Sequence, residues 1–167
     1  MKKKRPARQV ARAALIAALY VVLTVLASML GLSSSAIQLR FSEALTVLPL
    51  FTSAAVPGLF IGCLLSNILT GAVIWDVIFG SLATLLGALG TRKLRHVLIA
   101  GKPYPALLPP IIANVLIIPF VLSYAYGLED GIPFLMLTVG IGEILSVGGL
   151  GTILMTALYP RRNQIFQ

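Results

Sequence analysis

Residues 13–30 read AALIAALYVVLTVLASML, an apolar stretch without a charged side chain. As a helix rising about 1.5 Å per residue, this stretch is about 27 Å long, close to the roughly 30 Å hydrocarbon core of a bilayer. The basic residues before it resemble the start of a signal peptide, but no small-residue cleavage site follows. We therefore expect residues 13–30 to be retained as a first membrane-spanning helix.

The rest of the chain is equally apolar. Hydrophobic residues make up 58% of the sequence and charged residues 11%, with a mean hydropathy of +0.98, so the protein has too few polar side chains to cover its surface. Two further spans are expected, over Pro105–Tyr126 and Ile132–Tyr159. The last is interrupted by Gly148, Gly149 and Gly151.

Residues 44–91 carry a single charge, Asp76, and divide at Pro57-Gly58 and near Gly71 into three stretches shorter than a full span. The sequence therefore predicts an all-α integral membrane protein, a compact bundle of six transmembrane helices of which three are short or tilted. Four spans with a re-entrant hairpin between residues 44 and 75 are the alternative.

Twelve of the thirteen Lys and Arg residues lie in three blocks, at the N-terminus, at residues 92–102 and at residues 161–162. Because Lys and Arg accumulate in cytoplasmic loops, both termini and the middle block are predicted to be cytoplasmic. The chain is then one integral membrane domain: a basic tail (1–12), the six-helix bundle (13–159) and a second cytoplasmic tail (160–167). We expect a multi-pass protein of a bacterial plasma membrane. The +8 net charge indicates contact with anionic membrane lipid rather than nucleic acid, because the basic residues flank apolar spans.

Several chemistries lack their sequence signatures. There is no Walker motif for ATP hydrolysis, no Gly-x-Ser-x-Gly elbow and no His-Glu-x-x-His motif. Cys63 and His96 are the only cysteine and histidine, which leaves no pattern for a metal site. We therefore expect neither an enzyme nor a bound cofactor or metal.

Once the topology is fixed, the polar residues gather in the outer half of the bundle. Glu43, Asn67 and Asp76 fall at the outer ends of spans, and Glu143 and Asn114 reach further in. Ionisable side chains at such depths usually face a water-filled cavity, so this pattern predicts an outward-facing acidic pocket.

Each of these residues also has a purely structural interpretation. Arg40 and Glu43 are spaced for an ion pair at a helix start, and Asp76 can serve as a helix-starting acid. Asn67 and Asn114 suit interhelical hydrogen bonds. For Glu143 we favour ligand contact, because no basic residue lies near it in sequence. Trp75 is a candidate for stacking on a flat ligand.

Small residues recur along the first helix, at positions 7, 11, 13, 14, 17 and 18. Small side chains at a spacing of four allow close helix approach, either inside this chain or with another membrane subunit.

Three segments resemble a known family: QLRFSEALTVLP (38–49), GLFIGCLLSN (58–67) and DVIFGSLAT (76–84). They are similar to the QueT family, substrate-binding S components of energy-coupling factor (ECF) transporters associated with uptake of queuosine precursors. The resemblance implies an outward pocket capped by the loop containing Arg40 and Glu43. It also implies a transmembrane coupling subunit and two ATPase subunits as partners, with either Ala13 and Ala17 or Ala14 and Ala18 at the docking face.

A 7-deazaguanine suits such a pocket, because its ring N–H and exocyclic amine donate to a carboxylate while its flat face stacks on an aromatic ring. Our hypothesis is an S component that binds a 7-deazaguanine queuosine precursor. An S component for another vitamin and a stand-alone secondary carrier are the alternatives. The expected binding residues are Glu143, Asp76, Glu43, Arg40, Trp75, Asn67, Asn114 and Gln38.

Overall fold

The computed structural model describes residues 5–32 and 39–165, which are mostly helical. Within these residues no strand occurs beyond an isolated bridge between Ile99 and Lys102. The elements follow in the order α1 (Arg5–Met29), η1 (Phe41–Leu50), α2 (Ala55–Leu69), α3 (Ile74–Leu94), η2 (Tyr104–Leu107), α4 (Leu108–Tyr124), α5 (Ile132–Glu143), η3 (Ile144–Gly151), α6 (Thr152–Leu158), η4 (Tyr159–Arg161) and α7 (Arg162–Ile165).

Four helical segments are long and apolar enough to cross a membrane: Pro6–Met29, Ile74–Leu94, Tyr104–Tyr124 and Ile132–Arg161. The first and the last two agree with the predicted spans. The prediction that residues 44–91 hold only short stretches is wrong for its last part. The chain turns at Gly71, which has a φ of +73°, and α3 then continues past the expected end to Leu94, giving a helix of 21 residues.

The element η1 is a 3₁₀ helix at the centre of the bundle. It has 10 residues, although runs beyond three or four are uncommon, and every side chain from Ser42 to Leu50 is buried. At about 2 Å per residue it is roughly 20 Å long, shorter than a bilayer core. The preceding Arg40 lines a pocket with Asp76, at the start of α3. At the other end, Arg92 of α3 donates from Nη1 to the Pro49 carbonyl at 3.0 Å. Thus η1 follows α3 from one end of the bundle to the other.

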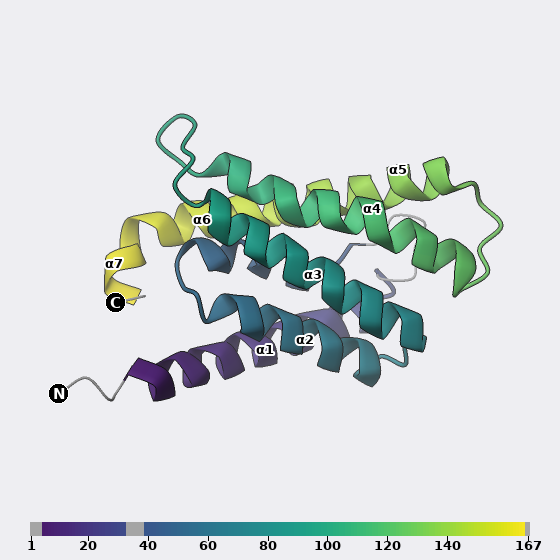
Figure 1. Ribbon diagram of the computed structural model, residues 1–167, viewed down its shortest axis with the longest axis horizontal. Coiled ribbons are helices and arrows are strands. Elements are labelled where there is room, and N and C mark those ends of the chain that lie inside the picture. The colour runs from purple at the N-terminus through teal and green to yellow at the C-terminus, as the bar shows by residue number, and fades with distance from the viewer. Residues whose placement is uncertain (1–4, 33–38, 166–167) are drawn as a thin grey trace.

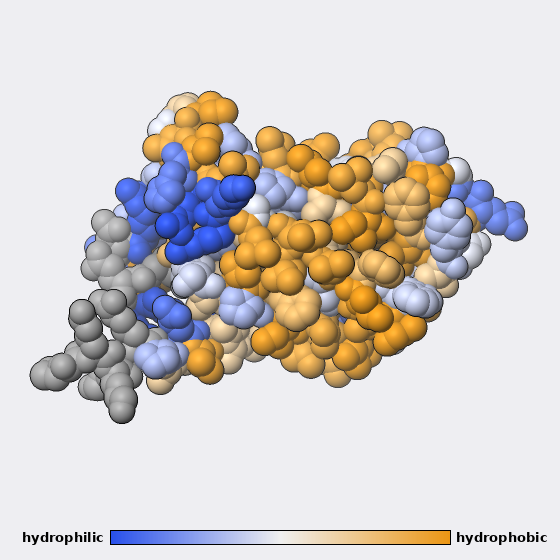
Figure 2. Space-filling model, in the orientation of Figure 1, coloured by the Kyte–Doolittle hydropathy of each residue, from blue (hydrophilic) through white to orange (hydrophobic). Residues whose placement is uncertain are grey.

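Neighbouring helices in the chain are neighbours in space, α1 packing on α2, α2 on α3, α3 on α4 and α4 on α5. The start of α1, the α3–α4 connection and α7 lie at one end of the bundle, and the α2–α3 and α4–α5 connections lie at the other (Figure 1). Figure 2 shows hydrophilic residues gathered mainly at these two ends, with a broad apolar belt between them. The arrangement is that of a helical bundle shaped for a bilayer.

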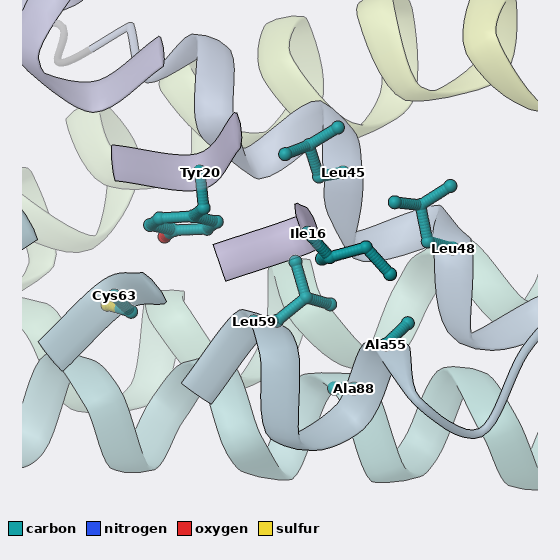
Figure 3. Packing of buried hydrophobic residues seen from close by; sticks show 8 residues of the cluster. All are labelled: Ile16, Tyr20, Leu45, Leu48, Ala55, Leu59, Cys63 and Ala88. Atoms are coloured by element: carbon teal, nitrogen blue, oxygen red, sulfur yellow. The ribbon is translucent and has the colours of Figure 1, made fainter. Parts of the chain in front are cut away.

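Close contact between α1 and α2 depends on two glycines. A Cβ at Gly62 would lie 2.7 Å from the Tyr20 Cβ and 3.1 Å from the Ala17 Cα, and one at Gly58 would lie 2.8 Å from the Ala13 carbonyl oxygen. Since real Cβ atoms rarely come so close, only glycine fits here. The same interface continues into an apolar cluster that joins α1, η1, α2 and α3 (Figure 3).

This packing distinguishes the two alanine registers of α1. Ala13 and Ala17 contact α2 inside the chain, and Ala17 is buried. Ala14 and Ala18 are exposed. The register that remains accessible to another subunit is therefore that of Ala14 and Ala18.

The last long segment contains a π-helical stretch, η3, which begins directly after Glu143 and includes Gly148, Gly149 and Gly151. Gly151 faces η1, where an added Cβ would lie 3.0 Å from the Val47 Cγ1. Gly151 thus lets this segment approach the central 3₁₀ helix. Wide turns of this kind often occur at functional sites.

Candidate functional site

Glu43, at the start of η1, is almost completely buried in the core. The Tyr20 hydroxyl of α1 donates a hydrogen bond to its Oε1. Next to this pair, Thr24 Oγ1 of α1 donates to Ser42 Oγ at 2.8 Å. Polar side chains of α1 therefore meet the start of the central 3₁₀ helix inside the apolar bundle.

Glu143, at the end of α5, is the second buried carboxylate of this region, and it interacts electrostatically with Glu43. Asn114 of α4 is buried too and lies within hydrogen-bonding reach of both carboxylates. A small cavity of about 10 Å³, close to the space that one water needs, is lined by Arg40, Asn114, Glu143 and two apolar residues.

Asp76, at the start of α3, forms a second polar centre. The Tyr126 hydroxyl donates to its Oδ2 at 2.9 Å, and Asn67 Nδ2 donates to its backbone carbonyl at 3.2 Å. Partial burial, together with the nearby Asp76 charge, raises the pKa of Tyr126, and the protonated phenol donates this bond. A Cβ at Gly80 would lie 3.0 Å from Asp76 Oδ1, so the missing side chain makes room for the carboxylate.

Beside Asp76 lies an open pocket of about 330 Å³, within the usual range for small-molecule sites. Its polar lining comes from Arg40, Asn67, Asp76, Tyr126, Thr24, Ser28 and Thr70. Arg40 also lines the small cavity at Glu143, so its side chain separates the two spaces. Its guanidinium interacts with Asp76, Glu43 and Glu143, while its backbone N–H donates to Ser146 Oγ at 3.3 Å.

Each of the three carboxylates keeps one buried oxygen without a hydrogen-bond partner among the described residues: Glu43 Oε2, Asp76 Oδ1 and Glu143 Oε2. Unsatisfied buried oxygens are costly to a fold, so such a group signals a function or an absent partner. With three carboxylates around one arginine, the site is suited to a ligand rich in N–H donors.

The predicted site residues thus fall into three sets. Arg40, Glu43, Asn67, Asp76, Asn114 and Glu143 come together at one end of the bundle. Trp75 does not join them: it is 56% exposed, stacks on Phe79 with ring centroids 6.0 Å apart, and lines an apolar groove on the outer surface between α3 and α4. Gln38 lies outside the described residues.

Sequence reasoning missed Tyr20, which bonds Glu43, and Tyr126, which lines the pocket at Asp76. Tyr20 lies in an apolar span, where a buried hydroxyl requires a partner, and it shares a helix face with Ala13, Ala17 and Thr24. The position of Tyr20 on the same helix face as these residues could have indicated that its side chain points into the bundle. Tyr126 follows the end of α4 in a connection, and nothing in the local sequence indicates that it reaches back to Asp76.

The described residues contain no group of three His, Cys, Asp or Glu side chains that could hold a metal ion.

The family model of the QueT transporter matches residues 10–160, which covers nearly the whole bundle. The chain belongs to the QueT transporter family. With four helices able to cross a membrane, this membership makes it a multi-pass membrane protein of a transporter family. The resemblance inferred from three short segments is confirmed.

One similar relative is the queuosine precursor transporter QueT of Lactococcus lactis subsp. cremoris (strain MG1363). It is 37% identical over 84 residues, which amount to 50% of this chain and 49% of the relative. The match thus spans about half the length of that protein. No solved structure matches the chain.

Proposed function

We propose that this protein is the substrate-binding membrane subunit of an ECF-type importer and that it captures a 7-deazaguanine precursor of queuosine from outside the cell. The observation that carries the proposal is the convergence of three buried carboxylates, each with an unpaired oxygen, at one end of the bundle. The family membership and the name of the relative point to the same ligand class.

The ligand chemistry suits this convergence. The pyrimidine edge of a 7-deazaguanine offers a ring N–H and an exocyclic amine, which a carboxylate accepts as a pair. An aminomethyl substituent adds a positive charge. Acidic surroundings therefore favour an aminomethyl-7-deazaguanine over an anionic vitamin. Tyr126, which lines the pocket, is a better stacking candidate than Trp75, which does not.

Access to Glu143 depends on Arg40. The open pocket at Asp76 has room for a bicyclic base, whereas the cavity at Glu143 has room for little more than a water. In our proposal the ligand enters beside Asp76 and displaces the Arg40 side chain. Glu143 then accepts from the base edge. Arg40 and Glu43 belong to the segment that closes over the ligand.

The orientation follows from charge. The end of the bundle with Arg92, Arg95 and Arg162 faces the cytoplasm in our proposal, so both termini are cytoplasmic, the acidic pocket opens outward, and the membrane is the bacterial plasma membrane. In this orientation η1 and α2 complete six traverses of the bilayer, and the bundle (13–159) with its two tails forms one domain.

The exposed face of α1 is the candidate docking surface for the coupling subunit, which in turn carries two ATPases. Ala14 and Ala18 are exposed on α1, as are Ala7 and Ala11. Small side chains at this spacing permit close approach of a second helix. ATP hydrolysis is assigned to the partners.

Competition binding tests the substrate class. The purified chain in detergent should bind aminomethyl- or cyano-7-deazaguanine, and riboflavin and biotin should not displace either. Displacement by one of these vitamins would instead favour an S component for another heterocycle. Uptake into vesicles that contain this chain alone would favour a stand-alone secondary carrier.

A further inference from the structure

A second hollow, of about 430 Å³, lies at the opposite end of the bundle from the acidic site. It is formed between the connection that follows α3 and the segment Tyr159–Arg162. Its lining combines cationic groups with apolar and aromatic side chains: Arg92, Arg95, His96, Arg162, Leu50, Phe51, Leu98, Pro103 and Tyr159. We call it the basic pocket.

Each of the three arginines of the basic pocket donates a hydrogen bond within the described chain. Arg92 Nη1 donates to the Pro49 carbonyl at 3.0 Å, Arg95 Nε donates to His96 Nε2 at 2.8 Å, and Arg162 Nη1 donates to the Tyr159 carbonyl at 2.9 Å. Each bond engages one of the five N–H groups of a guanidinium. Within the described chain, donors therefore remain on all three for an anion.

Tyr159 also orients one of these groups. The guanidinium of Arg162 lies over the Tyr159 ring, 4.2 Å from its centroid, in a cation–π contact. The exposed side chain of Arg162 thus stacks on a residue that lines the same pocket.

No acidic residue balances these charges. The five Asp and Glu residues of the sequence are at positions 43, 76, 129, 130 and 143, and none lines the basic pocket. The pocket therefore gathers three guanidinium groups without an acidic neighbour in its lining, and phosphate groups favour such surroundings.

The loop beside the basic pocket is apolar at its tip. Val97, Leu98 and Ile99 are 46%, 53% and 59% exposed, and the bridge between Ile99 and Lys102 holds the loop as a tight hairpin. Figure 2 shows this hydrophobic tip next to the hydrophilic cluster. Apolar side chains exposed beside arginines are typical of a surface at the level of lipid headgroups.

We propose that the basic pocket binds the phosphate group of an anionic phospholipid headgroup, while the Val97–Ile99 tip lies in the adjoining apolar layer. Arg95 and Arg162 contact the phosphate oxygens in this arrangement, and Arg92 fixes the floor of the pocket through Pro49. The basic pocket is distinct from the transport pocket, so a negative result for lipid binding would leave the transport proposal untouched, and the reverse also holds.

The test is lipid retention measured by native mass spectrometry on the full chain in detergent. The protein is titrated with dioleoylphosphatidylglycerol, with dioleoylphosphatidylcholine and with inorganic phosphate. The test variant is Arg95→Gln with Arg162→Gln. The matched control is Lys93→Gln with Lys102→Gln, which removes two charges from the same end of the bundle without altering the lining of the pocket.

We expect phosphatidylglycerol to be retained in preference to phosphatidylcholine, with about tenfold or greater loss in the arginine variant and less than about twofold loss in the control. Should the double variant fail to fold, Arg162→Gln alone, whose side chain is exposed, gives the same comparison. Equal losses in variant and control, equal retention of the two lipids, or displacement of phosphatidylglycerol by inorganic phosphate would overturn the proposal.

Discussion

Replacing Glu143 by Gln changes one oxygen of a buried carboxylate into an amide nitrogen and removes the charge. In the free protein, Glu143 Oε2 has no hydrogen-bond partner among the described residues, so it is the oxygen available to a ligand. If the N–H groups of a 7-deazaguanine bind there, the variant presents a donor where an acceptor is needed. A hydrogen bond to a charged group contributes about 1.5–3 kcal/mol, so Kd should rise about 10- to 150-fold.

Isothermal titration calorimetry with aminomethyl-7-deazaguanine measures this change. Glutamine has nearly the same shape as glutamate and can still interact with Asn114, so the unfolding midpoint in detergent should stay close to that of the unmodified protein. The matched control is Glu129→Gln, the same substitution at an exposed position of the α4–α5 connection. The control should bind as the unmodified protein does.

Two results would refute the reasoning. A Kd for Glu143→Gln within about twofold of the unmodified protein would remove Glu143 from the site. A similar loss in Glu129→Gln would mean that general acidity at this end of the bundle, rather than a specific contact, attracts the ligand.

Three further changes test other parts of the account. Tyr20→Phe removes the donor to Glu43 and leaves a buried carboxylate oxygen unpaired, so the free energy of unfolding in denaturant titrations should fall by about 1–3 kcal/mol. The control Tyr124→Phe, at an exposed position, should leave the free energy of unfolding unchanged. Equal stability of the two variants would contradict the buried bond. Gly80→Ala places a Cβ 3.0 Å from Asp76 Oδ1 and 3.1 Å from Asn67 Nδ2, so ligand affinity measured by calorimetry should drop. The control Gly148→Ala, whose Cβ meets Ile144 at 3.7 Å, should leave ligand affinity unchanged. Full affinity in Gly80→Ala would mean that Asp76 does not contact the ligand. Ala18→Leu should retain ligand binding and lose co-purification with the coupling subunit and its ATPases. The control Leu137→Phe, at an exposed position of α5, should retain ligand binding and co-purification. An intact complex with Ala18→Leu would place the docking surface elsewhere.

The sequence predicted the long membrane-spanning segments because these depend on composition. Long apolar segments and their basic flanks are one-dimensional signals, and the spans at α1, α4 and α5–α6 appear where they were expected. The buried 3₁₀ helix η1 was not foreseen as such. Nine of its ten residues, Ser42 to Leu50, are buried, so no periodic alternation of polar and apolar residues marks its type.

The candidate site was predictable in part. Ionisable residues in apolar segments stand out at once, which is why Asp76, Glu43 and Glu143 could be named. Their pairing depends on helix rotation, which sequence alone does not give. Trp75 adjoins Asp76 in the chain, yet consecutive helical residues point about 100° apart, and it therefore faces the outer groove while Asp76 faces the pocket.

The two alanine registers of α1 also could not be distinguished without knowledge of helix packing. Ala13 and Ala14 are equivalent in sequence, and only the approach of Gly58 and Gly62 of α2 shows which face is already occupied.

An experimental structure of the protein with aminomethyl-7-deazaguanine tests the central claim most directly. We expect the base between Arg40 and Tyr126, with its ring N–H and exocyclic amine within about 2.7–3.2 Å of the carboxylate oxygens of Glu143. A ligand seated instead in the apolar groove at Trp75, or a base edge without a carboxylate partner, would contradict it.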